Sequence, residues 1–272
     1  MTLPLTPQVF AILRGLIEDR TGLHYAATDR ELLAERVSAR AEEAGFETLL
    51  DYYYFLRYDP GADAELSALV EQLVVNETYL FREIEQLRVL VSQVVRPLAG
   101  QGRVRIWSAA CATGEEPITL AALLMAEGLL DQVELVASDI SPRVLARARS
   151  GRLGRRSLRA VRPEECRSWL RLEADGTAQV DPALLSRIAW HQVNLVDAAQ
   201  VTAMGRFDVV LCRNVLIYFA DETAARVVDA VSRTLRPDGV LVVSVTESLL
   251  RFGTSLACQE LAGVFFYRKV SP

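Results

Sequence analysis

Cysteine and histidine are scarce in this chain. Its 272 residues include two histidines and four cysteines, Cys111, Cys166, Cys212 and Cys258. The cysteines lie far apart and form no Cys-x-x-Cys pair, so the sequence predicts neither a zinc site nor a framework of disulfide bonds. We therefore expect no bound metal and a reducing, cytoplasmic environment.

Long apolar runs are also missing. No stretch approaches the roughly 20 apolar residues that span a membrane, and residues 1–10 lack a basic segment followed by an apolar one. We expect a soluble, cytoplasmic protein with no direct membrane insertion. The net charge of −5 gives the chain no general attraction to nucleic acid, although a local basic patch could still matter.

What is present is enough apolar sequence for a full core, since 51% of the residues are hydrophobic. Residues 1–75 predict a small all-helical domain, because apolar residues recur three and four apart. The expected helices are Val9–Thr21, Asp29–Ala44, Phe46–Arg57 and Ala62–Val75. Residues 76–103 are expected to form a linker and the first helix of the next domain.

From residue 104 to 272 the pattern changes to short apolar runs separated by amphipathic helices, which predicts an α/β domain with a doubly wound, mainly parallel sheet. The expected strands are Val104–Ser108, Val133–Ser138, Ile188–Val193, Phe207–Cys212, Val240–Val245 and Val264–Arg268, the last a reversed edge strand. A basic stretch, Arg152–Arg156, and a turn at Asp175–Gly176 interrupt the alternation. They predict an inserted β-subdomain at about residues 151–187.

In such a sheet, ligands bind beyond the carboxyl ends of the strands. The first strand leads into Ala109–Pro117, a run of small residues with one glycine where a dinucleotide fingerprint has three. Small residues there either admit a ligand close to the backbone or only permit tight packing of strand on helix. Glu115 and Glu116, near the start of the next helix, disfavour a phosphate and suit a cationic ligand.

Later strand ends favour a nucleoside. Asp139 follows the second strand at the distance where ribose is bound; it could instead cap the next helix, but Ser141 before Pro142 can cap that helix alone. Asn194 can satisfy the edge of a purine while Leu195 packs on its face. We favour a ribose contact for Asp139. Asn194 and Leu195, taken alone, are better explained as strand-end turn residues, and only the combination favours a nucleoside pocket.

One further motif precedes the sheet, Asn76–Glu83, which reads Asn-Glu-Thr-Tyr-Leu-Phe-Arg-Glu. Taken alone, Arg82 and Glu83 would be a solvated surface pair and Tyr79–Phe81 part of the core. Together with the strand ends, however, the motif strongly resembles the CheR-type chemotaxis protein glutamate methyltransferases, in order and over essentially the whole chain. The matching segments are Asn76–Glu83, Trp107–Pro117, Ala137–Ile140, Ala146–Gly151 and Phe207–Phe219.

The resemblance implies a helical N-terminal domain, a Rossmann-like methyltransferase sheet with an inserted β-subdomain, and methyl transfer from S-adenosylmethionine to receptor glutamates. The products would be glutamate methyl esters, which serve sensory adaptation, and S-adenosylhomocysteine. Carried over to this sequence, the cofactor contacts are Asn76, Thr78, Arg82, Glu116, Asp139, Asn194, Leu195, Cys212 and Arg213. Arg82 and Tyr218 are the candidate catalytic residues that orient the acceptor, although Tyr218 could merely wall the pocket.

The implied partner is the cytoplasmic helical bundle of a chemoreceptor, which is the protein substrate. We expect the protein to act as a monomer and to bind no nucleic acid. Three features depart from the family. Several members have a densely basic second helix, whereas Asp29–Ala44 mixes both charges and offers Arg36 and Arg40 on one face. The short segment Leu170–Thr177 has one glycine, so we predict independence from a receptor C-terminal pentapeptide tether. Val245–Ser248 replaces the usual His-Ser-Glu run, with no predicted consequence.

Two other functions would use the same cofactor site. One is methylation of a small molecule or a nucleic acid, because the fold does not determine the acceptor. Methylation of amides or bases commonly uses an Asn or Asp-Pro-Pro-Tyr type tetrapeptide after the fourth strand, where this chain has Arg213–Leu216. The other is a non-catalytic S-adenosylmethionine sensor or scaffold, which would bind the cofactor without forming a methyl ester.

Overall fold

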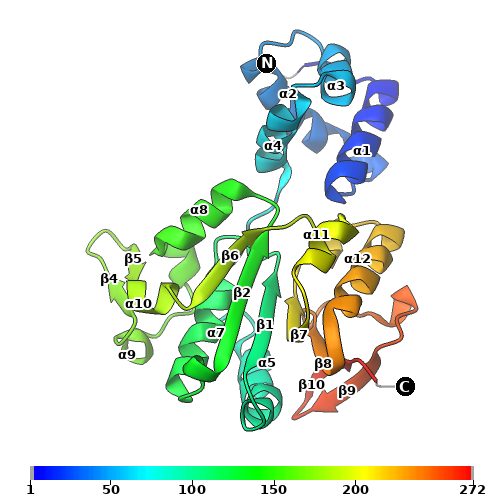
Figure 1. Ribbon diagram of the computed structural model, residues 1–272. Helices are drawn as coiled ribbons and strands as arrows, with labels where there is room; N and C mark the ends of the chain where they lie inside the picture. Colours follow the sequence, from blue (N-terminus) through cyan, green and yellow to red (C-terminus); the bar gives the residue numbers. More distant parts are fainter. Residues whose placement is uncertain (1–2, 271–272) are drawn as a thin grey trace. The chain divides into compact units, whose positions relative to one another are not determined.

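The computed structural model describes residues 3–270 and divides into two compact units (Figure 1). The first contains the residues up to Val75 together with Tyr218–Thr223, and the second contains Asn76–Ile217 and the residues from Ala224 onward. The outer ends of the expected terminal domains, residues 1–2 and 271–272, lie outside the described residues. No helix within residues 3–270 is both long enough and apolar enough to cross a membrane.

The first unit contains four α-helices, as predicted: α1 Pro7–Thr21, α2 Arg30–Glu43, α3 Leu49–Tyr58 and α4 Ala62–Leu73. Helix α1 begins where the Thr6 side chain accepts a hydrogen bond from the Val9 N–H, and it ends at Gly22, which adopts φ 80°. The apolar faces of the helices meet in one buried cluster that includes Leu13, Val37, Tyr52 and Leu69.

The second unit is built on a seven-stranded sheet in the order β6-β2-β1-β7-β8-β10-β9 (Figure 1). Its strands are β1 Val104–Ala109, β2 Val133–Asp139, β6 Ile188–Gln192, β7 Phe207–Cys212, β8 Leu235–Val242, β9 Ala257–Leu261 and β10 Val264–Arg268. The first five in the spatial order are parallel, and β10 runs antiparallel to both β8 and β9. The predicted doubly wound sheet is thus confirmed.

One detail of the strand prediction is wrong. Val264–Arg268 is reversed as expected, but β9 rather than β10 forms the edge of the sheet. The sequence does not mark Ala257–Leu261 as a strand because it has no apolar run: only its last residue, Leu261, is large and apolar, and all five residues are exposed or half-buried. Sequence patterns detect buried strands better than solvated edge strands.

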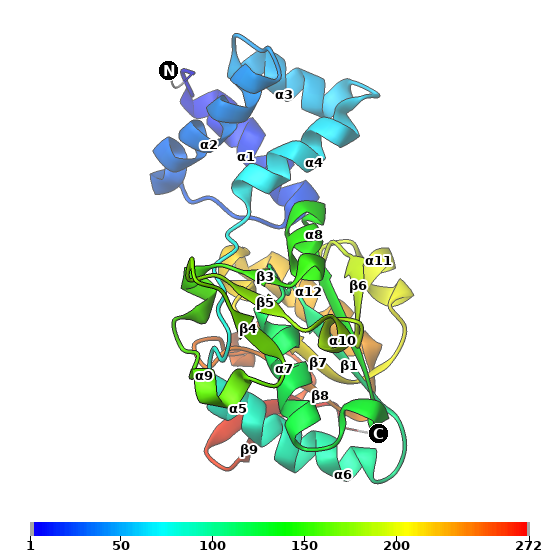
Figure 2. The same cartoon turned by 90° about the vertical axis from the view of Figure 1, so that its left-hand side faces the viewer.

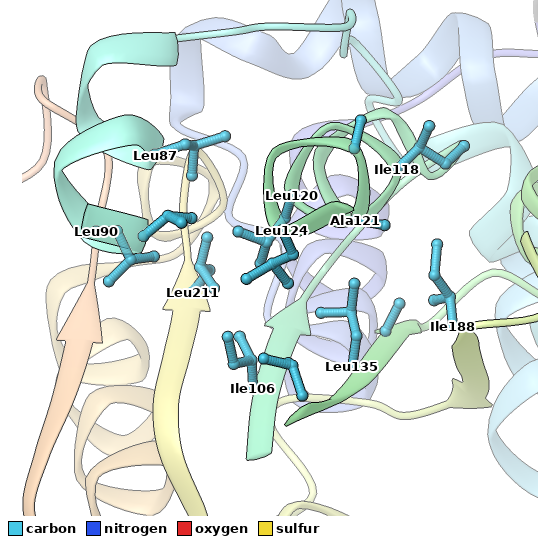
Figure 3. Packing of buried hydrophobic residues seen from close by; sticks show 14 of the residues in the cluster. Leu87, Leu90, Ile106, Ile118, Leu120, Ala121, Leu124, Leu135, Ile188 and Leu211 are labelled. Atoms are coloured by element: carbon cyan, nitrogen blue, oxygen red, sulfur yellow. The ribbon is translucent and has the colours of Figure 1, made fainter. Parts of the chain in front are cut away.

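Helices cover both faces of the sheet (Figures 1 and 2). They are α5 Ile84–Val89, the π-helical η2 Leu90–Val95, α6 Arg96–Ala99, α7 Glu115–Ala126, α8 Pro142–Ser150, α11 Ala198–Ala203 and α12 Asp221–Thr234. Successive residues of a strand point to opposite faces of the sheet. On the face covered by α7, Ile106 of β1 and Leu211 of β7 pack with Leu120 and Leu124 in one cluster (Figure 3). Helices α11 and α12 lie on the opposite face.

The predicted insertion is also present. A three-stranded antiparallel sheet, in the order β3-β5-β4, is formed by β3 Arg152–Leu153, β4 Leu170–Leu172 and β5 Ala178–Val180 (Figure 2). The short helices α9 Pro163–Cys166 and α10 Pro182–Leu185 flank these strands. Strands β4 and β5 are joined by a tight turn in which Gly176 adopts φ 78° and the Asp175 carboxylate accepts the Thr177 N–H.

Candidate cofactor and active site

Polar and small residues meet at the carboxyl edge of the parallel strands. Strands β6, β2, β1 and β7 are neighbours, so the turns that follow them lie at the same edge of the sheet. Six of the predicted cofactor residues end these strands or follow them, namely Glu116, Asp139, Asn194, Leu195, Cys212 and Arg213. The other three, Asn76, Thr78 and Arg82, precede α5. Their contacts with a cofactor remain predictions.

The turn after β1 is tightly constrained. Ala110 and Ala112 have φ values of 57° and 47°, in the left-handed region that side chains with a Cβ rarely adopt. Gly114 has φ 92°, and a Cβ added there would lie 2.9 Å from both Ala148 and Trp190. Gly114 therefore serves close packing, and the two alanines hold the turn in a strained conformation at the edge where a ligand is expected.

Asp139 stabilises this turn from the end of β2. One carboxylate oxygen accepts the Ala112 N–H at 2.9 Å and the other accepts the Ser141 N–H at 3.0 Å. The Ser141 hydroxyl accepts the Val144 N–H at 3.1 Å and so caps α8. The capping alternative for Asp139 is thereby answered in favour of Ser141, and Asp139 fixes the geometry of the cofactor edge instead.

A buried arginine joins three parts of the site. The Arg213 side chain is 1% exposed, and its guanidinium donates to Glu116 at 2.6 Å, to Glu83 at 2.9 Å and to Gln86 at 2.8 Å. Ser108 of β1 donates to the other oxygen of Glu116 at 2.6 Å. The guanidinium is thus occupied by protein groups, and any contact of Arg213 with the cofactor falls to its backbone.

Glu247 is a site residue that the sequence reasoning missed. Its carboxylate accepts the backbone N–H groups of Asn214 at 2.8 Å, Leu216 at 3.0 Å and Ser244 at 3.0 Å. Asn214 has φ 58°, so this turn after β7 is strained as well. The Ser244 hydroxyl donates to Glu83 at 3.0 Å. The unusual run Val245–Ser248 therefore still supplies the carboxylate that holds the turn.

The segment before α5 is fixed through its backbone. The Phe81 N–H donates to Thr119 at 3.1 Å, and Leu80 is fully buried, as the core interpretation of Tyr79–Phe81 expects. The Arg82 guanidinium donates to the Glu77 carbonyl at 2.9 Å and lies 5.9 Å from the centre of the Tyr79 ring. Arg82 does not pair with Glu83, whose charge is taken by Arg213.

Two more predicted residues lie in turns. Asn194 follows β6 and its side chain accepts the Val196 N–H at 3.2 Å, while Leu195 is 6% exposed. Tyr218 belongs to the first unit, where its carbonyl accepts the His24 N–H at 2.8 Å, and it is half-buried. A strand-end turn at Asn194 is therefore present, and its contact with a purine remains a prediction.

Negative charge dominates the cofactor edge. Two carboxylates, Glu83 and Glu116, pair with the buried guanidinium of Arg213, and three more lie in the turns of this edge: Glu115, Asp139 and Glu247. Burial raises the pKa of Cys111 well above its usual value, and the charges of Asp139 and Glu116 raise it further. Burial, Glu247 and Glu116 do the same to the pKa of Cys212. Both thiols stay protonated, and the field suits a cation such as a sulfonium or ammonium, not a phosphate.

Protonation of Glu83 is expected to loosen this network in acid. Burial alone would raise the pKa of Glu83, but the charge of Arg213 and hydrogen bonds from Val245 and Ser244 outweigh burial and lower it below 4.5. Because the folded pKa is the lower one, the stabilisation is complete above about pH 4.5 and is lost as the pH falls through the folded pKa. The free energies of unfolding of wild type and Glu83→Gln, measured with urea, should differ at pH 7, and the difference should shrink as the pH falls below about 4.5. A constant difference would contradict this.

In the first unit, the two arginines expected on one face of α2 are engaged internally. Arg36 donates to the Leu73 carbonyl at 2.6 Å. Arg40 forms a bidentate pair with Glu65, which also accepts the Tyr52 hydroxyl at 2.6 Å. Both guanidinium groups are thus hydrogen-bonded within the first unit, and the charge of Arg40 is also paired with that of Glu65. Among residues 3–270, no group of three or more His, Cys, Asp or Glu side chains could hold a metal ion.

Comparisons with known proteins agree with this geometry. The family model of the CheR methyltransferase SAM binding domain matches residues 76–262, and that of the CheR methyltransferase all-alpha domain matches residues 8–74. Chemotaxis protein methyltransferase 2 of Vibrio cholerae is 34% identical, over 92% of this chain and 88% of that protein. Chemotaxis protein methyltransferase 1 of Pseudomonas aeruginosa is 30% identical, over 88% and 90%.

A chemotaxis protein methyltransferase of Klebsiella aerogenes is 32% identical, over 90% of this chain and 85% of that protein. The family models together cover both units, and the relatives match along most of their own length. The resemblance seen in the sequence motifs is therefore confirmed, and S-adenosylmethionine is the cofactor. The chain belongs to the CheR family of S-adenosylmethionine-dependent methyltransferases.

Proposed function

We propose that this protein methylates glutamate side chains of chemoreceptors and so forms the methyl esters used in sensory adaptation. The carboxylates at the cofactor edge support the cofactor part of this proposal, because they suit the two cationic groups of S-adenosylmethionine within a family that binds this cofactor. The named relatives are chemotaxis protein methyltransferases, which favours a receptor as the acceptor. The nine predicted contacts, from Asn76 to Arg213, would hold the cofactor.

S-adenosylmethionine supplies a methyl group that its sulfonium makes electrophilic. An ionised glutamate carboxylate is already a nucleophile, so the protein needs no strong base, and the protonated thiols of Cys111 and Cys212 offer none. The work of the protein is to align the acceptor and to keep water away. We assign Arg82 to pairing with the acceptor carboxylate or with that of the cofactor, and Tyr218 to orienting the acceptor oxygen.

Replacing Arg82 by Ala, or Tyr218 by Phe, is expected to lower kcat for methyl transfer by about 100-fold, because each removes a group that positions the reacting atoms. Circular dichroism should show both variants folded. The matched control is Tyr58→Phe, since Tyr58 is a tyrosine of the first unit that is 70% exposed. Near-normal turnover in both variants would refute these assignments.

The decisive experiment incubates the protein with methyl-labelled S-adenosylmethionine and receptor cytoplasmic fragments from the same organism. Label released by mild base is expected, as a glutamate ester requires. Base-stable label would identify another acceptor, and label on nucleic acid or a small molecule would identify another substrate class. Binding of S-adenosylhomocysteine without transfer to any fragment would favour a sensor or scaffold.

We further propose that recognition is independent of a receptor C-terminal pentapeptide. The turn between β4 and β5 is short, and local hydrogen bonds of Asp175 and Gly176 fix its shape. Few residues of this turn are therefore available to contact a peptide. Deleting the last five residues of a receptor should change the methylation rate by less than about twofold, since no avidity is lost. A large loss of rate would show that the insertion does hold a tether.

A further inference from the structure

A groove lined by arginines lies beside the cofactor motif of the second unit. Its volume is about 790 Å³. Four arginines line it, namely Arg143, Arg147, Arg156 and Arg159, together with Thr113 and the two predicted cofactor contacts Asn76 and Thr78. Asn76 opens the motif before α5 and Thr113 lies in the strained turn after β1, so a ligand in the groove would lie close to the expected cofactor.

The groove is part of an unusual concentration of positive charge. Residues 143–167 contain nine arginines and only two acidic residues, Glu164 and Glu165, although the whole chain has a net charge of −5. Arg143 and Arg147 are four residues apart on α8, where side chains share one face and like charges repel. Arg143 also sits in the first turn of α8, where a positive charge opposes the helix dipole.

Only some of these arginines are neutralised by the protein. Arg152 pairs with the Asp175 carboxylate in the turn of the β-subdomain, whereas Arg155 donates to the Asp175 carbonyl. Within residues 3–270, neither Arg147 nor Arg156 forms an ion pair. Both are exposed. The groove therefore offers guanidinium groups to an outside partner.

One wall of the groove is preorganised. The Arg159 guanidinium carbon lies 3.8 Å from the centre of the Tyr79 ring, and the same group donates to Glu77 at 3.2 Å. Glu77 is the one carboxylate that lines the groove. The hydroxyl of Ser157, another residue of the groove, donates to the buried Glu115 at 2.6 Å, and the Ser157 carbonyl accepts the Leu80 N–H. These bonds tie the basic stretch to the cofactor turn and to the motif before α5.

We propose that this groove binds acidic side chains of the protein substrate that flank its acceptor glutamate. The inference rests on the proposed function and specifies how the substrate is held. Guanidinium groups bind carboxylates with directional, charge-assisted hydrogen bonds. A nucleic acid fits less well, because its phosphates would meet the carboxylate-rich cofactor edge next to the groove. A protein segment can place one carboxylate at the methyl group and others on the arginines.

The test compares two double variants with the same loss of charge. Arg147→Gln with Arg156→Gln removes groove arginines, and Arg162→Gln with Arg167→Gln removes exposed arginines of the same stretch that do not line the groove. The groove variant should raise KM for the receptor fragment about tenfold, and its kcat/KM should depend less on salt. Its kcat and its affinity for S-adenosylhomocysteine should match wild type, as should every constant of the control variant.

Equal KM values in the two variants would overturn the inference. If the groove variant lost about as much affinity for S-adenosylhomocysteine as for the receptor fragment, the groove would belong to the cofactor. If the groove variant bound a 20-base-pair duplex more weakly than wild type while its KM for the fragment stayed unchanged, the groove would belong to nucleic acid. In a fragment whose flanking Asp and Glu residues are changed to Asn and Gln, the groove variant and wild type should perform alike. If wild type forms no base-labile ester, the proposed function fails. Calorimetric titration of the receptor fragment into the complex of the protein with S-adenosylhomocysteine then tests the groove separately, because it measures the dissociation constant of the fragment without methyl transfer.

Discussion

Replacing Arg213 by Met is expected to lower the free energy of unfolding by about 3–5 kcal/mol, because the change leaves buried charge without its partner. Glu83 and Glu116 are 17% and 15% exposed, and both lose their ion pair with Arg213. Gln86 loses its donor as well. The segment before α5, the turn after β1 and the end of β7 then separate. Urea unfolding followed by circular dichroism measures the effect.

The exposed Arg171 provides the control. Its side chain is 77% exposed and pairs with Glu173, so Arg171→Met should change the free energy of unfolding by less than about 0.5 kcal/mol. Combining Arg213→Met with Glu116→Gln should recover part of the lost stability, because one of the orphaned charges is removed. Wild-type stability in Arg213→Met would show that the network contributes little.

Replacing Asp139 by Ala is expected to weaken S-adenosylhomocysteine binding by about 30- to 150-fold, the effect of losing charge-assisted hydrogen bonds worth about 2–3 kcal/mol. Two effects add: the proposed ribose contact disappears, and the Ala112 N–H loses the acceptor that fixes the strained turn. Isothermal titration calorimetry gives the dissociation constant directly.

Ser141→Ala is the matched control for this change. It removes the cap of α8 and so costs about 1 kcal/mol of stability, but it leaves Asp139 in place. Its affinity for S-adenosylhomocysteine should therefore equal that of wild type. If Asp139→Ala also bound like wild type, both the ribose contact and the role of the carboxylate in the turn would be wrong.

Local sequence patterns were sufficient to predict the helical unit, the main parallel strands and the insertion, because each has a periodic apolar face or a strong turn signal. They were also sufficient to show that acidic and small residues follow the strands. They could not show which groups those residues bind. Asp139 and Ser141 were competing caps in the sequence, and only the direction of the Val144 N–H decides between them.

The contacts that organise the site join residues far apart in the chain. Arg213 is 130 residues from Glu83 and 97 from Glu116, and Glu247 is 33 residues from Asn214. No local pattern marks such pairs, which is why the sequence did not reveal that the Arg213 guanidinium binds Glu83 and Glu116, or that Glu247 belongs to the site. The edge strand β9 was missed for the opposite reason, since it has too little burial to leave a pattern.

The buried cysteines allow local unfolding of this protein to be measured by the rate at which their thiols are labelled. The thiolate is the form that reacts with maleimides, and burial raises the pKa of Cys166 to about 11 and that of Cys111 and Cys212 well above the usual value. Cys258 on β9 is exposed. A maleimide dye therefore labels the folded protein at Cys258 on the edge strand, and the three buried cysteines are labelled only when local unfolding exposes them.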